Sequence, residues 1–403
     1  MKYRFKKPGL LVRVVIAIIL GISLGSFAPA SLVRGVNTVV ALIDQFIKFM
    51  VPLIILGLVT PAIAETGRGA GKLLLATVAI AYGSTLFAGF IGYSVSAAVF
   101  PSFVSSCAGD VMNAAKDFPA YVKIAIPPVM DVMTALVFSF VAGLGMVFAA
   151  SDALKRVFQD FREVVVRAVS GALVPMLPVF IFGIFFDMSA TGRAVFVIKQ
   201  FAAIIAVFSI LTLVVIFLQF CVAGVVARRN PIKAMWTMLP AYMTALGTSS
   251  SAATIPVTRA QTLANGVSRE IADFTIPLCA TVHLAGSTVK IVSCAVALML
   301  MAGRGAEVNI VTFAAFIAMT GIVMVAAPGV PGGAIMAALG ILESILGFDQ
   351  AQIALMVTLY VAMDSIGTAC NIAGDGAIAI VVDRIFGMRK NPSSEKESEG
   401  RRQ

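Results

Sequence analysis

A few ionisable residues lie deep inside apolar runs in the second half of the sequence. They are His283, Lys290, Asp364 and Asp375. Ionisable groups in such segments are costly to bury, and by default they indicate a functional site with a nearby partner. We therefore begin the functional assignment from these four side chains.

Asp364, Thr368, Asn371 and Asp375 are spaced at i, i+4, i+7 and i+11, which predicts one polar stripe on a single apolar helix. Two carboxylates, an amide and a hydroxyl can ligate a hard cation, because such cations prefer oxygen ligands. The same groups can hold a substrate ammonium. The stripe therefore predicts a cation site, a substrate site, or both.

His283 and Lys290 are seven residues apart, so we expect them to share one face of a neighbouring helix. A second interpretation is that Asp364 or Asp375 pairs with Lys290 only to neutralise buried charge. That pairing is equally compatible with transport.

Three consecutive serines, Ser249–Ser251, interrupt the long apolar run 234–258. Gly247 and Pro256 flank them and would break a helix there, and backbone groups freed inside a membrane must be buried in protein or face water. Hydroxyls and backbone N–H groups at the end of a half-helix suit a carboxylate. The pattern predicts two short helices that meet at a serine-rich tip.

The sequence lacks the residue sets of common enzyme classes. No Ser-His-Asp set is plausible, since the only histidine stands in an apolar span without a nucleophile elbow. No Walker loop is present, so we do not expect ATP to drive the chain. The five cysteines form no CxxC motif and no metal spacing. We expect neither an enzyme nor a bound cofactor.

The composition indicates that helices spanning a membrane position these residues. Of the 403 residues, 60% are hydrophobic and 12% are charged, and the mean hydropathy is +1.00. A soluble domain carries about 25% charged residues, and a spanning helix needs roughly 20 apolar residues. This excludes a soluble enzyme, a β-barrel and a secreted disulfide scaffold. Eight spans are predicted, near 11–32, 38–64, 73–100, 125–150, 165–187, 197–227, 272–302 and 350–383.

The net charge of +10 follows membrane topology rather than nucleic-acid binding. Lysine and arginine cluster before the first span and after the second, fourth, sixth and last spans, as the positive-inside rule expects of cytoplasmic segments. Both termini are therefore predicted to be cytoplasmic. We interpret the first apolar run as a span rather than a signal peptide, and residues 386–403 as a disordered tail.

Two long apolar runs contain breaks in their middle. The first carries the serine tip, and the second, 308–342, contains APGVPGG at 327–333. Paired, Gly/Pro-interrupted segments in corresponding positions of a membrane protein indicate a transporter binding site at an inverted repeat. We expect two re-entrant hairpins, at 233–262 and 308–345, that enter from opposite faces. The other interpretation is two kinked spans.

Three segments, TALGTSSSAATIPVT, GVPGGAIM and MDSIGTACNIAGD, follow one another after residue 240. They resemble the first hairpin tip, the second hairpin tip and the last helix of the dicarboxylate/amino acid:cation symporter family, the glutamate-transporter-like proteins. The resemblance covers nearly the whole chain. It implies an all-α polytopic membrane protein with eight transmembrane helices, two re-entrant hairpins and an elevator fold. It also implies a homotrimer in the inner (plasma) membrane, in contact with lipid.

The same resemblance implies a division into scaffold and moving transport domain. The scaffold would comprise 1–64 with the first two helices, and 101–190 with an outer loop and helices four and five. The transport domain would comprise helix three in 65–100 and the segment 191–385, which holds helices six to eight and both hairpins.

For the substrate site, the resemblance implies that Ser250, Ser251 and Asn371 hold an α-carboxylate. Asp364 and Thr368 would hold the α-ammonium. The full set of substrate-binding candidates is Ser249, Ser250, Ser251, Ser287, Lys290, Val330, Gly332, Asp364, Gly367, Thr368 and Asn371, with Val330 and Gly332 at the second hairpin gate.

For sodium, the resemblance implies that Asn371 and Asp375 ligate one ion. Thr281 would contribute to another, together with backbone carbonyls near Met324, and Ser84 and Thr85 match the hydroxyls of a third site. His283 completes the set of metal-site candidates.

The sequence departs from the family pattern at the residues that decide ions and substrate. The family's NMDG motif stands here as His283–Leu284–Ala285–Gly286, so a sodium-binding aspartate is replaced by Ala285. The arginine that recognises an acidic side chain is replaced by Gly367. With the short tip GVPGG and the SSSAATIP segment, these departures resemble the serine/threonine:sodium branch, whereas Lys290 matches neither branch.

The sequence therefore predicts cation-coupled symport of a small neutral amino acid such as serine, threonine or alanine. An acidic amino acid or C4-dicarboxylate is the alternative, with Lys290 as the anion partner. A channel would need a continuous polar pore, and a sensor or scaffold would need a signalling domain that the short tail does not supply. Sodium is the expected coupling ion, with fewer ions than in glutamate-type relatives, and a proton carried by His283 or Lys290 is the alternative.

Overall fold

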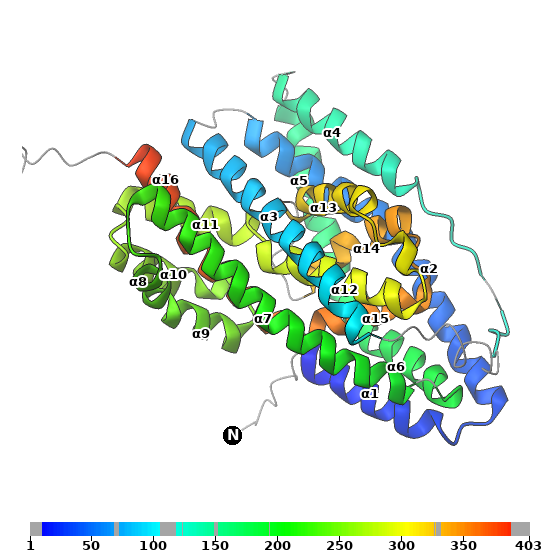
Figure 1. Ribbon diagram of the computed structural model, residues 1–403. Coiled ribbons are helices and arrows are strands. Elements are labelled where there is room, and N and C mark those ends of the chain that lie inside the picture. The colour runs from blue at the N-terminus through cyan, green and yellow to red at the C-terminus, as the bar shows by residue number, and fades with distance from the viewer. Residues whose placement is uncertain are drawn as a thin grey trace, which may run out of the picture.

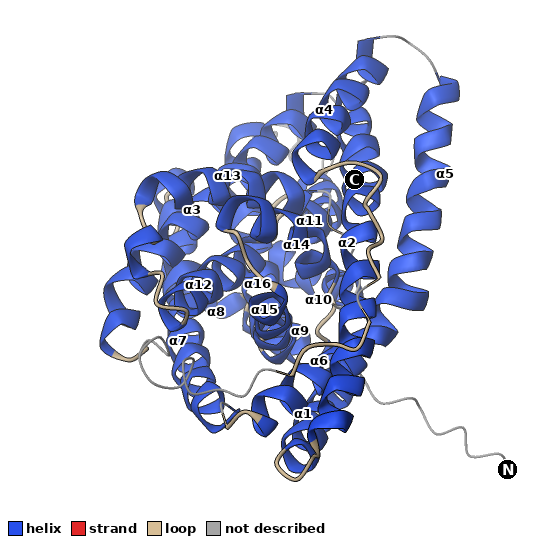
Figure 2. Cartoon of the chain, turned by 90° about the vertical axis from the view of Figure 1, so that its right-hand side faces the viewer, coloured by secondary structure: helices blue, strands red, loops and turns tan. Residues whose placement is uncertain are grey.

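The computed structural model describes residues 10–67, 72–104, 118–122, 124–148, 152–192, 194–325, 327 and 332–387. Within these ranges every regular element is a helix, as Figure 2 shows. The helices of the first half are α1 (Leu10–Gly25), α2 (Ala30–Gly67), α3 (Lys72–Val99), η1 (Phe100–Ser102), α4 (Val132–Phe148), α5 (Asp152–Ala168), η2 (Val169–Leu173) and α6 (Val174–Ala190).

The second half is divided into more and shorter helices. They are α7 (Ala194–Ala227), α8 (Pro231–Thr237), α9 (Leu239–Thr248), α10 (Ser251–Ala264), α11 (Arg269–Val282), α12 (Ala285–Met301), η3 (Gly305–Glu307), α13 (Ile310–Val325), α14 (Gly333–Leu346), α15 (Gln350–Ala362) and α16 (Asp364–Phe386). By length and composition, six helices of the described residues are able to cross a membrane, so the chain is a multi-pass membrane protein. The count of eight spans remains a prediction.

Three predicted boundaries differ from the structure. The span predicted at 125–150 becomes helical only at Val132, because Pro127 and Pro128 lack the N–H groups of a helix interior. The span predicted at 165–187 does not begin at 165, because α5 continues through the π-helical η2 into α6. The second helix starts at Ala30 rather than at 38.

The helices α1, α2 and α4–α6 of the first half lie outside those of the second half, whereas α3 packs against α12 and α13 of the second half. In Figure 1, α1 packs along α6 at one edge of the molecule, and Figure 2 shows α5 standing at the outer edge. The core of the second half is formed by α12, α14, α15 and α16, which are buried along most of their length. The polar stripe therefore lies on one of these buried helices, α16.

Both interrupted runs fold as helical hairpins. The pair α9 and α10 and the pair α13 and α14 each pack against one another along the chain reversal. At the base of the second hairpin, the Arg304 guanidinium donates to the carbonyl of Leu346 (2.8 Å) and to Glu307 (2.6 Å). The hydrogen bond from Arg304 to the Glu307 carboxylate holds the pKa of Glu307 below its usual value. This contact ties the two ends of the hairpin together.

An apolar groove runs between α7 and the first hairpin. Its volume is about 370 Å³, and Trp236 of α8 stands in it, 62% exposed. In the sequence, Trp236 follows closely after Arg228, Arg229 and Lys233, the basic group that comes after α7. Tryptophan is enriched at membrane–water interfaces, where such basic residues also gather.

Candidate substrate and cation site

Two helix breaks create the site. The seventh predicted span stops at Val282 and restarts at Ala285, and the eighth stops at Ala362 and restarts at Asp364. The starts of α12 and α16 lie so close together that a Cβ on Gly286 would collide with the carbonyl oxygen of Gly367. The glycines therefore allow the starts of α12 and α16 to meet.

Each hairpin tip contains one residue with a positive φ. Ser249 ends α9 with a φ of 49°, the left-handed region that non-glycine residues rarely adopt. Ser250 then caps α10, and its hydroxyl accepts the Ala253 N–H at 3.3 Å. Gly332 begins α14 with a φ of 76°. Each tip thus presents the N-terminus of a helix.

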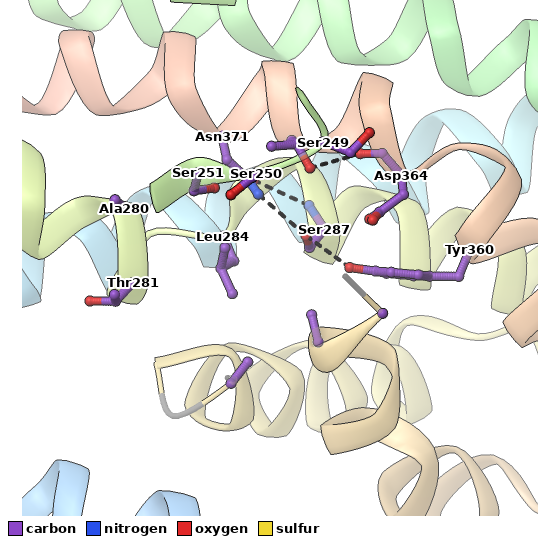
Figure 3. A pocket seen from close by; sticks show the side chains of 14 residues that line it. Ser249, Ser250, Ser251, Ala280, Thr281, Leu284, Ser287, Tyr360, Asp364 and Asn371 are labelled. Atoms are coloured by element: carbon purple, nitrogen blue, oxygen red, sulfur yellow. Dashed lines mark hydrogen bonds between the residues drawn. The ribbon is translucent and has the colours of Figure 1, made fainter. Parts of the chain in front are cut away.

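A small cavity lies where the tips meet α12, α15 and α16. Its volume of about 50 Å³ is several times what one buried water needs, roughly 10–15 Å³. Figure 3 shows Ser249, Ser250, Ser251, Asn371 and Asp364 gathered on one side, with Ser287 and Tyr360 beside them. The lining residues are Ser249, Ser250, Ser251, Ala280, Thr281, Leu284, Ser287, Ala327, Gly332, Ala334, Tyr360, Asp364, Thr368 and Asn371.

Asn371 and Ser287 form the polar wall of this cavity. The Asn371 carbonyl oxygen accepts the N–H groups of Gly286 (2.8 Å) and Ser287 (3.3 Å), so it caps the start of α12. The Ser287 hydroxyl accepts from Asn371 Nδ2 at 3.3 Å and from the Tyr360 hydroxyl at 3.2 Å. A hydroxyl has two acceptor positions and one donor, so the Ser287 proton is left to donate to a further acceptor.

Asp364 is the carboxylate of the cavity wall, and Lys290 neutralises it. The Lys290 ammonium donates to Asp364 Oδ1 at 3.0 Å, and it lies 3.3 Å from the centre of the Tyr360 ring. The Lys290 side chain is fully buried, whereas that of Asp364 is 17% exposed. Thr368 donates to the Asp364 backbone carbonyl at 2.8 Å. Neither Lys290 nor Gly367 lines the cavity.

Asp375 lies in a second polar cluster behind the cavity. His283 Nδ1 contacts Asp375 Oδ1 at 2.9 Å, and His283 Nε2 contacts the Ser84 hydroxyl at 3.0 Å. Because a carboxylate only accepts, the ring proton belongs on Nδ1, and Nε2 accepts from Ser84. Gln219 of α7 donates to the Ser84 oxygen at 3.0 Å. The other carboxylate oxygen, Asp375 Oδ2, is buried and has no partner.

The structure therefore divides the predicted sodium ligands. His283, Asp375 and Ser84 come together, but Thr85 donates into its own helix, to the Ala81 carbonyl. Thr281 lies at the edge of the cavity with its hydroxyl bonded to Leu278. Val330, the predicted gate residue, lies outside the described residues.

Sequence reasoning missed two side chains of these polar clusters, Tyr360 and Gln219. Tyr360 precedes Asp364 by four residues, and a tyrosine hydroxyl so close in sequence to a buried carboxylate is a signal of a polar contact. Gln219 is an amide deep inside the apolar run 200–227, which is itself a signal of a buried polar contact. Both signals were present in the sequence.

Comparison with known proteins assigns the chain to a family. Residues 10–385 match the sodium:dicarboxylate symporter family. The chain belongs to this family. Its relatives are named as transporters, in agreement with the expectation that the chain is not an enzyme.

This chain is 26% identical over 397 residues to the serine/threonine transporter SstT of Acinetobacter baumannii. The match covers 94% of this chain and 97% of that protein. It is 28% identical over 193 residues to the mouse neutral amino acid transporter B(0), covering 48% of this chain and 33% of that protein. It is also 28% identical over 259 residues to the mouse excitatory amino acid transporter 4, covering 61% of this chain and 44% of that protein. The chain thus spans less than half the length of these mammalian relatives.

Proposed function

We propose that this chain is a secondary active transporter that moves a small, net-neutral amino acid such as serine, threonine or alanine together with sodium. One observation carries the proposal: the first hairpin tip, Ser287, Asn371 and Asp364 surround one small cavity. Membership of a sodium:dicarboxylate symporter family and the names of the relatives support it.

The cavity has one end for each charge of an amino acid. Toward a carboxylate it offers the Ser287 hydroxyl proton and the backbone N–H groups at the start of α10, where the helix dipole also favours an anion. Toward an ammonium it offers Asp364, whose side chain is partly exposed to the cavity. These two ends match the α-carboxylate and α-ammonium of the substrate.

The lining supports a neutral rather than an acidic side chain. Among the described residues, no lysine or arginine lines the cavity, and Gly367 brings no side chain to it. The acidic alternative requires Lys290 as an anion partner, but its ammonium lies behind Asp364 and Tyr360. An acidic side chain would then be buried without a counter-charge, which costs several kcal/mol.

The orphaned oxygen of Asp375 supports sodium as the coupling ion. A fully buried carboxylate oxygen without a donor favours a cation nearby, and sodium takes oxygen ligands. The Ser84 side of the same cluster is filled by His283 and Gln219. We therefore propose one sodium ion at Asp375, and none at the hydroxyls of Ser84 and Thr85.

The wider architecture belongs to the same proposal. The outer position of α1, α2 and α4–α6 supports their role as a scaffold around a transport domain of α3 and α7–α16. The distribution of basic residues supports a cytoplasmic location for both termini. A homotrimer in the inner membrane, with an elevator movement, completes the proposal.

Uptake into proteoliposomes tests the function. We expect sodium-gradient-driven uptake of serine, threonine or alanine, and little uptake of aspartate or succinate. Asp375→Asn should abolish the response to sodium. The matched control is Asp383→Asn, the same change on the same helix but at a carboxylate that accepts from Ser268 far from the cavity. Uptake that needs a pH gradient and ignores sodium would contradict the proposed coupling.

A further inference from the structure

The Lys290 ammonium contacts the carboxylate of the cavity wall without reaching the cavity itself. Its Nζ lies 3.0 Å from Asp364 Oδ1, and its side chain has no exposed surface. A buried ammonium is stable only when a counter-charge and good partners surround it. Here the carboxylate supplies the counter-charge, and the Tyr360 ring face, 3.3 Å away, supplies a cation–π contact.

Gly367 provides the space in which the ammonium lies. A Cβ on residue 367 would stand 3.1 Å from Lys290 Nζ and 3.3 Å from its Cε. A Cβ alone requires the ammonium to move by only a few tenths of an ångström, whereas a longer side chain at this position would displace it from Asp364. The position of the Lys290 ammonium on α12 therefore depends on the absence of a longer side chain at Gly367 on α16.

Lys290 decides the charge of the site. Within the part of the chain that the structure describes, Asp364 is the only acid that lines the cavity, and no lysine, arginine or histidine does. The lining alone would therefore carry one negative charge. With Lys290 directly behind Asp364, the site has no net charge before a solute enters. Charges in a buried site are screened little by salt, so the balance is felt across the cavity.

We propose that Lys290 is a specificity-determining residue: by neutralising Asp364 from behind, it restricts the cavity to solutes without net charge. This inference rests on the proposed function and explains how it selects among amino acids. Asp364 keeps its second oxygen for an α-ammonium, while Lys290 balances the carboxylate when the cavity is empty. A zwitterion adds no net charge, so the site stays balanced when it is occupied.

A second lysine–aspartate pair serves as a matched control. Lys48 and Asp44 of α2 are 3.2 Å apart, and neither lines the substrate cavity. If Lys290 had only a structural role, removing either lysine would change stability or the amount of folded protein. A change in the charge preference of uptake is a readout that a structural role does not produce.

The test uses three four-carbon amino acids that differ in charge: threonine, aspartate and 2,4-diaminobutyrate. Competition against threonine uptake is measured in proteoliposomes of the full chain for the wild type, Lys290→Met, Lys290→Arg and Lys48→Met. We expect Lys290→Met to raise the 2,4-diaminobutyrate-to-threonine preference at least tenfold. Lys290→Arg should keep the preference of the wild type, and so should Lys48→Met.

A second pair of variants covers the case in which Lys290→Met does not fold. Asp364→Asn leaves the ammonium as the only charge and should shift the preference toward aspartate, whereas Asp364→Asn with Lys290→Met should remove that shift. Equal preferences within twofold in all folded variants would overturn the inference while leaving the proposed function standing. A wild type that takes up none of the three amino acids would instead contradict the proposed function.

Discussion

Asp364 and Asp375 both lie on α16, but their charges are balanced differently. Asp364 opens the helix at the cavity, is partly exposed, and has the fixed ammonium of Lys290 on one oxygen. Asp375 lies three turns further along, is fully buried, and meets an imidazole on one oxygen and nothing on the other. One carboxylate is balanced from within the chain, and the other is left for a mobile cation.

The difference separates two tasks that one helix has to perform. A carboxylate with a built-in counter-charge can receive an ammonium and release it again without leaving a bare charge behind. A carboxylate without one is stable only when an ion arrives, because a buried, unpaired charge is costly. The first arrangement suits a solute and the second suits a coupling ion.

The largest effect is expected from breaking the balanced pair. Asp364→Asn leaves the buried ammonium of Lys290 without a counter-charge, which should cost about 3–5 kcal/mol of folding free energy. Thermal unfolding in detergent without sodium measures this loss. Asp375→Asn should unfold at nearly the wild-type temperature under the same conditions, since it removes an unbalanced charge. Equal losses in the two variants would remove the distinction between the aspartates.

Sodium should stabilise only the second carboxylate. A ligand that binds the folded state alone stabilises it by about 2.7 kcal/mol at a concentration of 100 times its Kd. The melting temperature of the wild type should therefore rise with sodium concentration, relative to the same concentrations of choline. The rise should vanish in Asp375→Asn and persist in Asp364→Asn. A sodium-dependent rise that survives Asp375→Asn would place the ion elsewhere.

Replacing Gly374 or Gly367 of α16 with alanine tests how tightly the surroundings of Asp375 and of Asp364 are packed. A Cβ on Gly374 would meet His283 Cε1 at 2.8 Å and Gln219 Oε1 at 2.7 Å, within a rigid cluster. The same change at Gly367 meets the end of a flexible lysine at 3.1 Å. Gly374→Ala should therefore cost about 1–3 kcal/mol in stability, the usual penalty of overpacking, and Gly367→Ala less. Unfolding curves in which Gly367→Ala is the more damaging change would reverse this order.

The smallest effect is expected from Ser84→Ala. The change removes the shared partner of His283 Nε2 and Gln219 Nε2, so about 1–2 kcal/mol should be lost. The sodium-induced rise in melting temperature should remain, since Asp375 keeps its free oxygen. If the rise disappeared instead, the Ser84 hydroxyl would be a sodium ligand.

Much of the fold could be predicted from the sequence. Apolar runs of spanning length, the serine tip and the APGVPGG break predicted both helical hairpins, because glycine and proline have strong local effects. The start of the span predicted at 165–187 was wrong, because the charged residues of 152–167 end the apolar run although α5 continues through η2 into α6. Most of these charges are exposed on α5, and of the apolar residues only Val165 is fully buried.

The site was predictable in its residues but not in its pairings. The stripe from Asp364 to Asp375 lies on one helix, as its spacing indicated. His283 and Lys290 do not share a helix face, because the helix breaks at His283 and Leu284 without a proline or a preceding glycine. Periodicity assumes an unbroken helix, so it could not show that His283 meets Asp375 while Lys290 meets Asp364.

Trp236 gives the chain a built-in optical reporter. It is the single tryptophan of the sequence, and it stands exposed in the apolar groove beside the first hairpin. All indole fluorescence therefore originates within a few turns of the serine tip. In bilayers that contain brominated acyl chains, quenching of this signal reports contact between the hairpin and lipid without any added label.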